Sequence, residues 1–418
     1  MVESLIVIGI LVAVFVGYNI GGSSTGVAFG PAVGSRIVRK VTAAALFSVF
    51  AFLGAWTVGR NVIDTMSSDI VASSAFTPEA SVGVLFFTGL SLLVSNVYGV
   101  PASTSMTAVG AIVGLGLATG TLDAALMFTI LSAWIVAPLL ALLVGGVIGR
   151  YLYPHLDARF AFGRLQDPLL ALDREKTVPR PRLNSDASAR DLGGSALVLA
   201  IACYMGFSAG ASNAANAVAP LVGNGTVDAG PAVILAVGAI SLGGFTIARR
   251  TLDTVGNDIT DLPILAALIV STTGATIITV LSWLGIPASL AVSTTSCIIG
   301  LGWGRASRVQ PLTEIANPNT RQTGTPDHKT GALSAAPAKT ADETTASPTV
   351  GDLAEGSVPD PDRQLPDGGP SPIGEEQPDV LSAESLFDAG AAARIVVLWV
   401  LTPMLAVVGS YLVFTFGL

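Results

Sequence analysis

Apolar segments of about membrane length recur along the chain, and they constrain its fold more than any other feature. Of the 418 residues, 51% are hydrophobic and 12% are charged, whereas about a quarter of a typical soluble domain is charged. A helix needs about 20 apolar residues to cross a hydrocarbon core roughly 30 Å thick. The sequence therefore predicts an all-α polytopic membrane protein with about 10 to 12 membrane segments. The candidate segments are Ser4 to Val16, Val41 to Val58, Val82 to Val97, Ala124 to Gly149, Gly193 to Phe207, Pro231 to Ile247, Pro263 to Leu284 and Ile395 to Phe416.

Two polar stretches divide the apolar part of the chain. Residues 154–192 are rich in Arg and Lys, and the positive-inside tendency places such a loop in the cytoplasm. Residues 309–392 are rich in Asp, Glu, Pro, Gly, Ser and Thr, a composition typical of disordered segments. We therefore predict a first membrane repeat over 1–153, a basic cytoplasmic loop over 154–192, a second repeat over 193–308, an acidic linker over 309–392, and the last transmembrane helix of the second repeat over 393–418.

An internal duplication organises these segments. The stretch "GGSSTGVAFGPAVG" at Gly21 to Gly34 reappears as "GASNAANAVAPLVG" at Gly210 to Gly223, and three further pairs follow in the same order. A repeat of this length is typical of half a secondary transporter, whose substrate binds near the bilayer midplane between the two halves. We favour an inverted arrangement of the repeats. The further pairs are Gly59 to Ile70 with Ala248 to Ile259, Ser103 to Gly114 with Ser293 to Gly304, and Trp134 to Pro138 with Trp399 to Pro403.

Small polar residues interrupt the apolar run at two places in each repeat. In hydrocarbon, irregular backbone persists only where it is buried in protein or lines a cavity, so paired interruptions indicate broken helices at a transport site. The "PAST" of Pro101 to Thr104 and the "VSTT" of Val292 to Thr295 are typical of N-caps. Helix N-termini with free N–H groups favour anions. The hydroxyl donors predicted at this oxyanion site are Ser103, Thr104, Ser105, Ser293, Thr294 and Thr295.

Close helix packing is the competing explanation. Ser and Thr in membrane helices commonly serve interhelical hydrogen bonds, and for any single serine here the two explanations are equally good. The four clusters taken together favour a binding site.

These motifs resemble those of the PiT-type inorganic phosphate transporter family. The family signature reads approximately G-A-N-D-V-A-N-A-x-G, which "GASNAANAVA" at Gly210 to Ala219 approaches closely and "GGSSTGVAFG" at Gly21 to Gly30 more loosely; "GVPASTSMTAVGAIVG" at Gly99 to Gly114 is similar to a second family feature. The resemblance implies two inverted repeats with re-entrant hairpins and uptake of phosphate coupled to Na⁺ or H⁺. It places Ser23, Ser24, Ser212, Asn213 and Asn216 at the polar positions of the signature.

The chain departs from the family pattern in both copies of the signature. Ser23 and Ser24, and in the second copy Ser212 and Asn213, replace Asn and Asp, so that neither copy keeps a carboxylate. An acceptor-only Asp favours phosphate, which keeps a proton at neutral pH, over sulfate, which has none. Its loss makes sulfate the runner-up. Na⁺ remains an option as the coupling ion, with the amide oxygens of Asn213 and Asn216 as its ligands.

The predicted function is a secondary transporter that takes up inorganic phosphate across the plasma membrane, coupled to Na⁺ or H⁺, with the substrate bound between the repeats. The alternatives are a permease for sulfate or a related oxyanion, and an uncoupled channel-like or sensory membrane protein. An enzyme is not expected, because the two histidines, His155 and His328, lie in polar loops. We expect no cofactor other than the coupling ion, the bilayer as a partner and no nucleic acid, and we leave a homodimer open.

Overall fold

A computed structural model describes residues 2–35, 37–97, 103–159, 170–173, 180–183, 189–246, 264–308 and 389–417. Residues 309–388 of the acidic linker and most of the basic loop lie outside these residues, as does the 248–259 copy of the second repeated motif.

The first half of the membrane part consists of helices and helical turns joined by short loops in its described residues. It ends in a helix that continues through one π-helical turn into a short last helix. The elements are α1 (Val2–Gly34), α2 (Lys40–Thr57), α3 (Gly59–Asp64), the π-helical turn η1 (Thr65–Asp69), the 3₁₀ turn η2 (Ser73–Ala75), α4 (Pro78–Val97), α5 (Thr104–Thr119), α6 (Ala124–Val147), the π-helical turn η3 (Ile148–Leu152) and α7 (Tyr153–Arg159).

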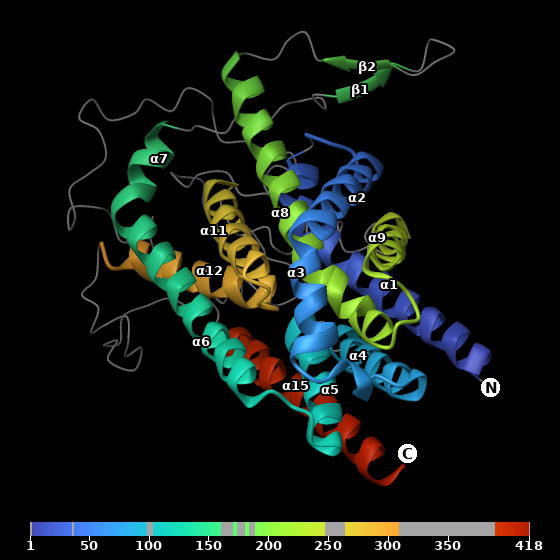
Figure 1. Cartoon of the computed structure of the whole chain (residues 1–418). Coiled ribbons are helices and arrows are strands. Elements are labelled where there is room, and N and C mark those ends of the chain that lie inside the picture. The colour runs from blue at the N-terminus through green and yellow to red at the C-terminus, as the bar shows by residue number, and fades with distance from the viewer. Residues whose placement is uncertain are drawn as a thin grey trace.

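The second half repeats this order of helices. Helices α1, α2, α4, α5 and α6 correspond to α8, α9, α11, α12 and α15, which agrees with the repeat seen in the sequence (Figure 1). The elements are α8 (Ala189–Gly223), α9 (Ala229–Thr246), α11 (Ile264–Trp283), α12 (Leu290–Ala306) and α15 (Ala389–Phe416). An antiparallel hairpin of β1 (Leu170–Asp173) and β2 (Arg180–Leu183) lies in the central loop, so the all-α prediction holds for the membrane part and not for this loop.

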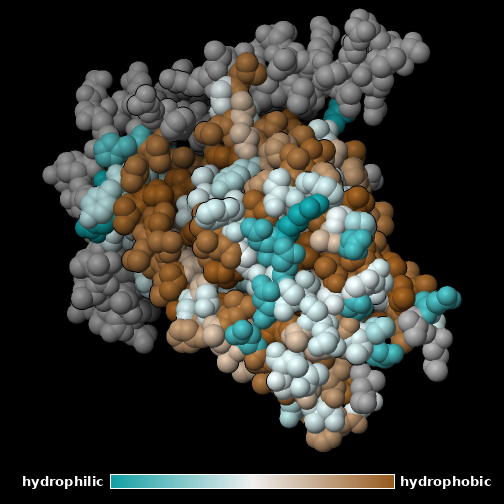
Figure 2. Space-filling view, in the orientation of Figure 1, coloured by the Kyte–Doolittle hydropathy of each residue, from teal (hydrophilic) through white to brown (hydrophobic). Residues whose placement is uncertain are grey.

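The helices have the length and surface of membrane spans. Within the described residues, seven helices are long and apolar enough to cross a bilayer, and two shorter apolar helices accompany them. This number is compatible with the predicted total of about 10 to 12 segments. On α6, Phe128 is 74% exposed and Leu143 is 62% exposed, which is usual for side chains facing lipid and unusual in water. Apolar atoms cover much of the surface in Figure 2, and hydrophilic residues form a band over α3.

Reciprocal contacts between the repeats hold the helices together. Helix α2 packs on α8 and α1 on α9, while α5 packs on α15 and α12 on α6. Each of these pairs takes one helix from each repeat. At the first pair, a Cβ on Gly210 would overlap the carbonyl oxygen of Ala51, and at the second a Cβ on Gly21 would overlap that of Ile240. Small residues permit this close approach, which drives helix association in lipid.

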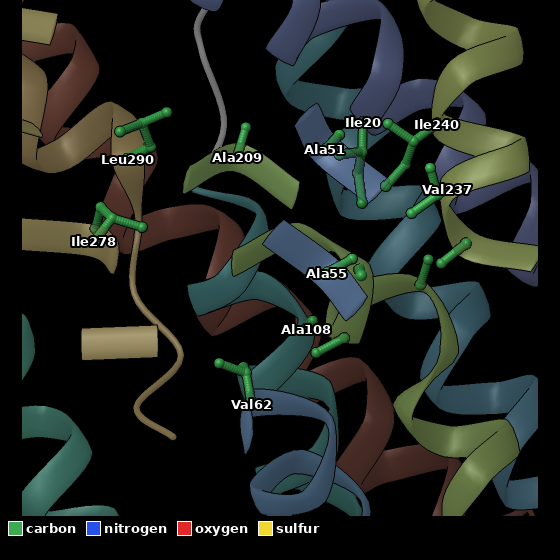
Figure 3. Close-up of a cluster of buried hydrophobic side chains, with 14 of the residues drawn as sticks. Ile20, Ala51, Ala55, Val62, Ala108, Ala209, Val237, Ile240, Ile278 and Leu290 are labelled. Atoms are coloured by element: carbon green, nitrogen blue, oxygen red, sulfur yellow. The ribbon is translucent and has the colours of Figure 1, made fainter. Parts of the chain in front are cut away.

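The apolar core lies where α1, α2, α8 and α9 meet. Ile20, Ala51 and Ile240 point into it and are at most 1% exposed, and Figure 3 shows them side by side. The core therefore lies across the interface between the repeats rather than inside either one.

Two local expectations about the backbone are wrong. The helix continues through the polar clusters of α1 and α8 instead of breaking there. In α1 hydroxyls return hydrogen bonds to the helix, as Thr25 Oγ1 does to Gly21 O at 2.8 Å, and in α8 the polar side chains bond to neighbouring elements, as Ser212 Oγ does to Ala288 O. The expected N-cap is correct for α5, which begins after Ser103. It is wrong for α12, whose N-cap is Ser289, so that "VSTT" lies inside the helix.

Candidate functional site

The two copies of the signature motif meet face to face. Asn213 of α8 donates a hydrogen bond from Nδ2 to Ser24 Oγ of α1 at 3.3 Å. The two residues are 189 positions apart, which is the offset of the sequence repeat. Equivalent positions of two copies can touch each other only close to the axis that relates the copies, so this contact marks the interface between the repeats.

The beginning of α5 completes the cluster. Thr104 Oγ1 donates to Asn213 Oδ1 at 2.7 Å. Asn216 Nδ2 lies 3.3 Å from Thr104 Oγ1, 3.1 Å from Ser105 Oγ and 3.2 Å from Asn213 Oδ1. Ser105 Oγ is also 3.3 Å from Ser212 Oγ. Two hydroxyls at the start of α5 and three polar residues of α8 therefore form one connected network.

The second hairpin, which consists of α11, α12 and the loop between them, joins the network through its backbone. Ser212 Oγ donates to Ala288 O at 2.7 Å, just before the N-cap Ser289. The hydroxyl of Thr294 instead donates to Leu290 O of its own helix at 2.9 Å, and its methyl group faces Gly274 of α11.

Five predicted site residues do not hydrogen bond to the cluster among the residues that the structure describes, namely Ser23, Ser103, Ser293, Thr294 and Thr295. Ser293 and Thr295 make no side-chain hydrogen bond to it, and Ser23 Oγ donates to Ile20 O of α1 at 3.0 Å. These five therefore stay predicted site residues that the structure does not join to the hydrogen-bonded cluster.

Two buried polar atoms of the site have no hydrogen-bond partner in the described part of the chain. They are Ser103 Oγ and Asn216 Oδ1, and both side chains are at most 1% exposed. A buried polar group without a partner costs about 1–3 kcal/mol. Such atoms are therefore natural contacts for a ligand.

The cluster is polar but uncharged. Its members Ser24, Thr104, Ser105, Ser212, Asn213 and Asn216 are hydroxyls and carboxamides, and no group of three or more His, Cys, Asp or Glu residues among the described ones could hold a metal ion. Anything bound here meets hydroxyls, amides and the positive end of α5.

Sequence reasoning missed Ser289 and the carbonyl of Ala288. A serine two residues after Pro287 and before an apolar run is a usable N-cap signal in the sequence. In the structure Ser289 Oγ accepts a hydrogen bond from Val292 N. The carbonyl contact had no signal, because it depends on how α8 meets a loop about 76 residues away.

Comparison with known proteins places the chain in a family. The family model described as "Phosphate transporter family" matches residues 20–410. The sulfate permease CysP of Bacillus subtilis is 33% identical over 298 residues, covering 71% of this chain and 77% of that protein. The chloroplastic inorganic phosphate transporter 2-1 of Arabidopsis thaliana is 23% identical over 400 residues, covering 73% and 68%.

A solved structure titled "The sodium-dependent phosphate transporter" shares the fold, with a TM-score of 0.63 at 17% identity over 98% of both chains. This likeness confirms the predicted fold class. With the family match over nearly the whole membrane part, it leads to one conclusion: the chain belongs to the phosphate transporter family.

Proposed function

We propose that the protein is a secondary transporter that takes up inorganic phosphate, bound at the network of Ser24, Asn213, Asn216 and the start of α5. The observation that carries this proposal is the Ser24 to Asn213 contact across the repeat interface. Alternating access requires a site that both halves share, and this pair belongs equally to both.

The donors of the site suit a tetrahedral oxyanion. The N-terminus of α5 offers backbone N–H groups beyond its N-cap Ser103, and Ser103 Oγ is buried with no partner among the described residues. Hydroxyls and the positive end of a helix stabilise an anion without a cationic side chain. In a buried site these interactions are stronger than in water.

Na⁺ fits the acceptors of the same network. Asn216 Oδ1 is buried and receives no hydrogen bond among the described residues, and Asn213 Oδ1 lies 3.2 Å from the amide of Asn216. Hard cations prefer oxygen ligands such as amide carbonyls. We therefore propose Asn213 and Asn216 as ligands of a coupling Na⁺.

Sulfate is the second candidate substrate, and the neutral site favours it. Among the described residues no carboxylate belongs to the network, so none of its side chains discriminates between an anion that carries a proton and one that does not. The sulfate permease of Bacillus subtilis is also similar to this chain, at 33% identity.

The wider setting of the transporter is also a proposal. We propose a plasma-membrane location with the basic central loop in the cytoplasm, because that loop concentrates Arg and Lys. We propose that residues 1–153 and residues 193–308 with 393–418 form the two repeats that move against each other. Transport without a catalytic step is the proposed activity, and a homodimer stays an option.

Uptake by proteoliposomes tests the substrate and the coupling together. Radiolabelled phosphate and sulfate are offered separately, under imposed Na⁺ or H⁺ gradients. We expect phosphate to accumulate against its gradient when Na⁺ is higher outside. Accumulation of sulfate alone would overturn the phosphate assignment in favour of the second candidate, and equilibration without accumulation would support a channel.

Two variants that each remove one hydroxyl test the contributions of α5 and α12 to uptake separately. Ser103→Ala removes a hydroxyl that has no structural partner in the described chain, so we expect uptake to fall about tenfold while stability is retained. Thr294→Val removes a hydroxyl that bonds its own helix, and we expect little loss of uptake. Equal losses in both variants would refute the proposed role of Ser103.

A further inference from the structure

The tip of the second hairpin is a short loop between α11 and α12 that several elements hold. Gly285 has a φ of +74°, a left-handed backbone that favours glycine, and a Cβ there would lie 2.7 Å from Thr65 Oγ1 of η1. Just before the loop, Asn61 Nδ2 of α3 donates to Trp283 O at 2.7 Å. The first repeat therefore holds one side of this loop.

Two side chains from different repeats hold consecutive carbonyls at the far side of the loop. Trp134 Nε1 of α6 donates to Pro287 O at 2.7 Å, and Ser212 Oγ of α8 donates to Ala288 O at 2.7 Å. Ser289, the N-cap of α12, comes next. The indole therefore holds the peptide unit adjacent to the one that the site itself binds.

Trp134 belongs to the repeated W-x-x-x-P motif, which the proposed binding site does not use. Its counterpart Trp399 is 9% exposed and forms an apolar cluster with Val292 of α12, against which Met106 of α5 also packs. Both motif tryptophans thus lie near the start of a short helix: Trp134 reaches the loop before α12, and Trp399 lies in the cluster of Val292 of α12 with Met106 of α5.

We propose that Trp134 is a positioning residue for transport: its indole N–H holds the tip of the second hairpin in place, so that the Ala288 carbonyl stays bound to Ser212 beside the anion site. An indole N–H that is not in water needs an acceptor, and Pro287 O supplies it. Without this bond, Ser212 is the side chain that still donates to a carbonyl on the far side of the loop, within the part of the chain that the structure describes. This inference rests on the proposed transport function only where uptake kinetics are used to test it.

Cysteine labelling at the loop tests the position of the tip without any substrate. In a background with Cys203→Ala and Cys297→Ala, Ala288→Cys introduces a thiol at a position that is 2% exposed. We expect Trp134→Phe, which keeps the ring and removes the N–H, to raise the rate of labelling by a water-soluble maleimide about fivefold. Losing one hydrogen bond of ordinary strength shifts a two-state equilibrium by about this factor.

Trp134→His keeps a ring N–H, so we expect a smaller rise in labelling than with Trp134→Phe. Trp303→Phe is the matched control, because Trp303 is 42% exposed on α12. In this variant the thiol at position 288 should be labelled at the parental rate. Labelling is compared on protein that elutes as a single folded peak. A parental rate in Trp134→Phe would overturn the proposal, as would an equal rise in Trp303→Phe.

Uptake kinetics supply the second readout. We expect Trp134→Phe to raise the KM for the transported anion about fivefold with a smaller change in maximal rate, and Trp134→His to restore part of the KM. If the parent protein transports neither phosphate nor sulfate, the proposed function fails, while the labelling result still decides the role of Trp134.

Discussion

Returning a carboxylate to the site should separate the two candidate substrates. Asn213→Asp keeps the shape of the side chain. It also keeps the oxygen that accepts from Thr104 at 2.7 Å and from Asn216 at 3.2 Å. Ser24 Oγ, which now accepts from Asn213 at 3.3 Å, can turn its own proton toward the new carboxylate. The variant should therefore fold, and it differs from the parent mainly by one negative charge.

The size of the effect follows from the distances within the network. An anion oxygen in contact with the Thr104 hydroxyl lies about 3 Å from it, and hence within about 6 Å of residue 213, whose side-chain oxygen is 2.7 Å from the same hydroxyl. With an effective dielectric constant of about 20, each pair of like charges at that separation costs about 3 kcal/mol. Sulfate carries two charges. Phosphate can carry one and can donate its proton to the carboxylate, so the two anions should differ by about 3 kcal/mol, or roughly a hundredfold.

Competition for uptake in proteoliposomes measures this difference. We expect Asn213→Asp to raise the apparent Kd for sulfate about a hundredfold more than the apparent Kd for phosphate. Asn213→Ser is the uncharged control, because serine is the residue that the first repeat has at this position, and it should not change the ratio. Equal losses for both anions in Asn213→Asp would refute the placement of the anion beside this residue.

Three further variants test the network and the packing. Asn216→Ala removes the amide that lies 3.1 Å from Ser105 Oγ, and we expect at least about a tenfold loss of uptake and about 1–3 kcal/mol of stability. Gly210→Ala should lower thermal stability strongly by overlap with backbone, whereas Gly238→Ala, which meets nothing within 4 Å, should not. Gly285→Ala forces a left-handed alanine at a φ of +74°, and we expect a cost of about 1–2 kcal/mol in thermal unfolding.

Much of the fold could be predicted because hydrocarbon restricts the choices of a chain. A stretch such as Ala124 to Gly149, with so few polar groups, has to satisfy its backbone within a helix, and the structure has α6 there. Ser24 and Asn213, which are 189 residues apart in the repeated sequence, also hydrogen bond to each other in the structure. The hydroxyls at Ser103, Thr104 and Ser105 were correctly expected at the start of a helix.

The failures have one physical origin, which is competition for hydrogen bonds. The polar cluster of α1 was expected to break the helix, yet Thr25 bonds the helix carbonyl of Gly21, so the backbone stays regular. The "VSTT" motif was expected to cap α12, yet Ser289 provides the cap one turn earlier, and Thr294 then turns to its own helix and to α11.

The sequence by itself determined the membrane class, the duplication and the residue types of the proposed uncharged oxyanion site, because hydropathy and self-similarity are properties of the chain alone. Only the tertiary structure decided which of these residues meet. It joined Asn213 to Ser24 and to Thr104, and it joined Trp134 to the loop at Pro287. Those contacts depend on how closely helices of opposite repeats approach, and that distance is set by packing around glycines such as Gly210 rather than by any local preference.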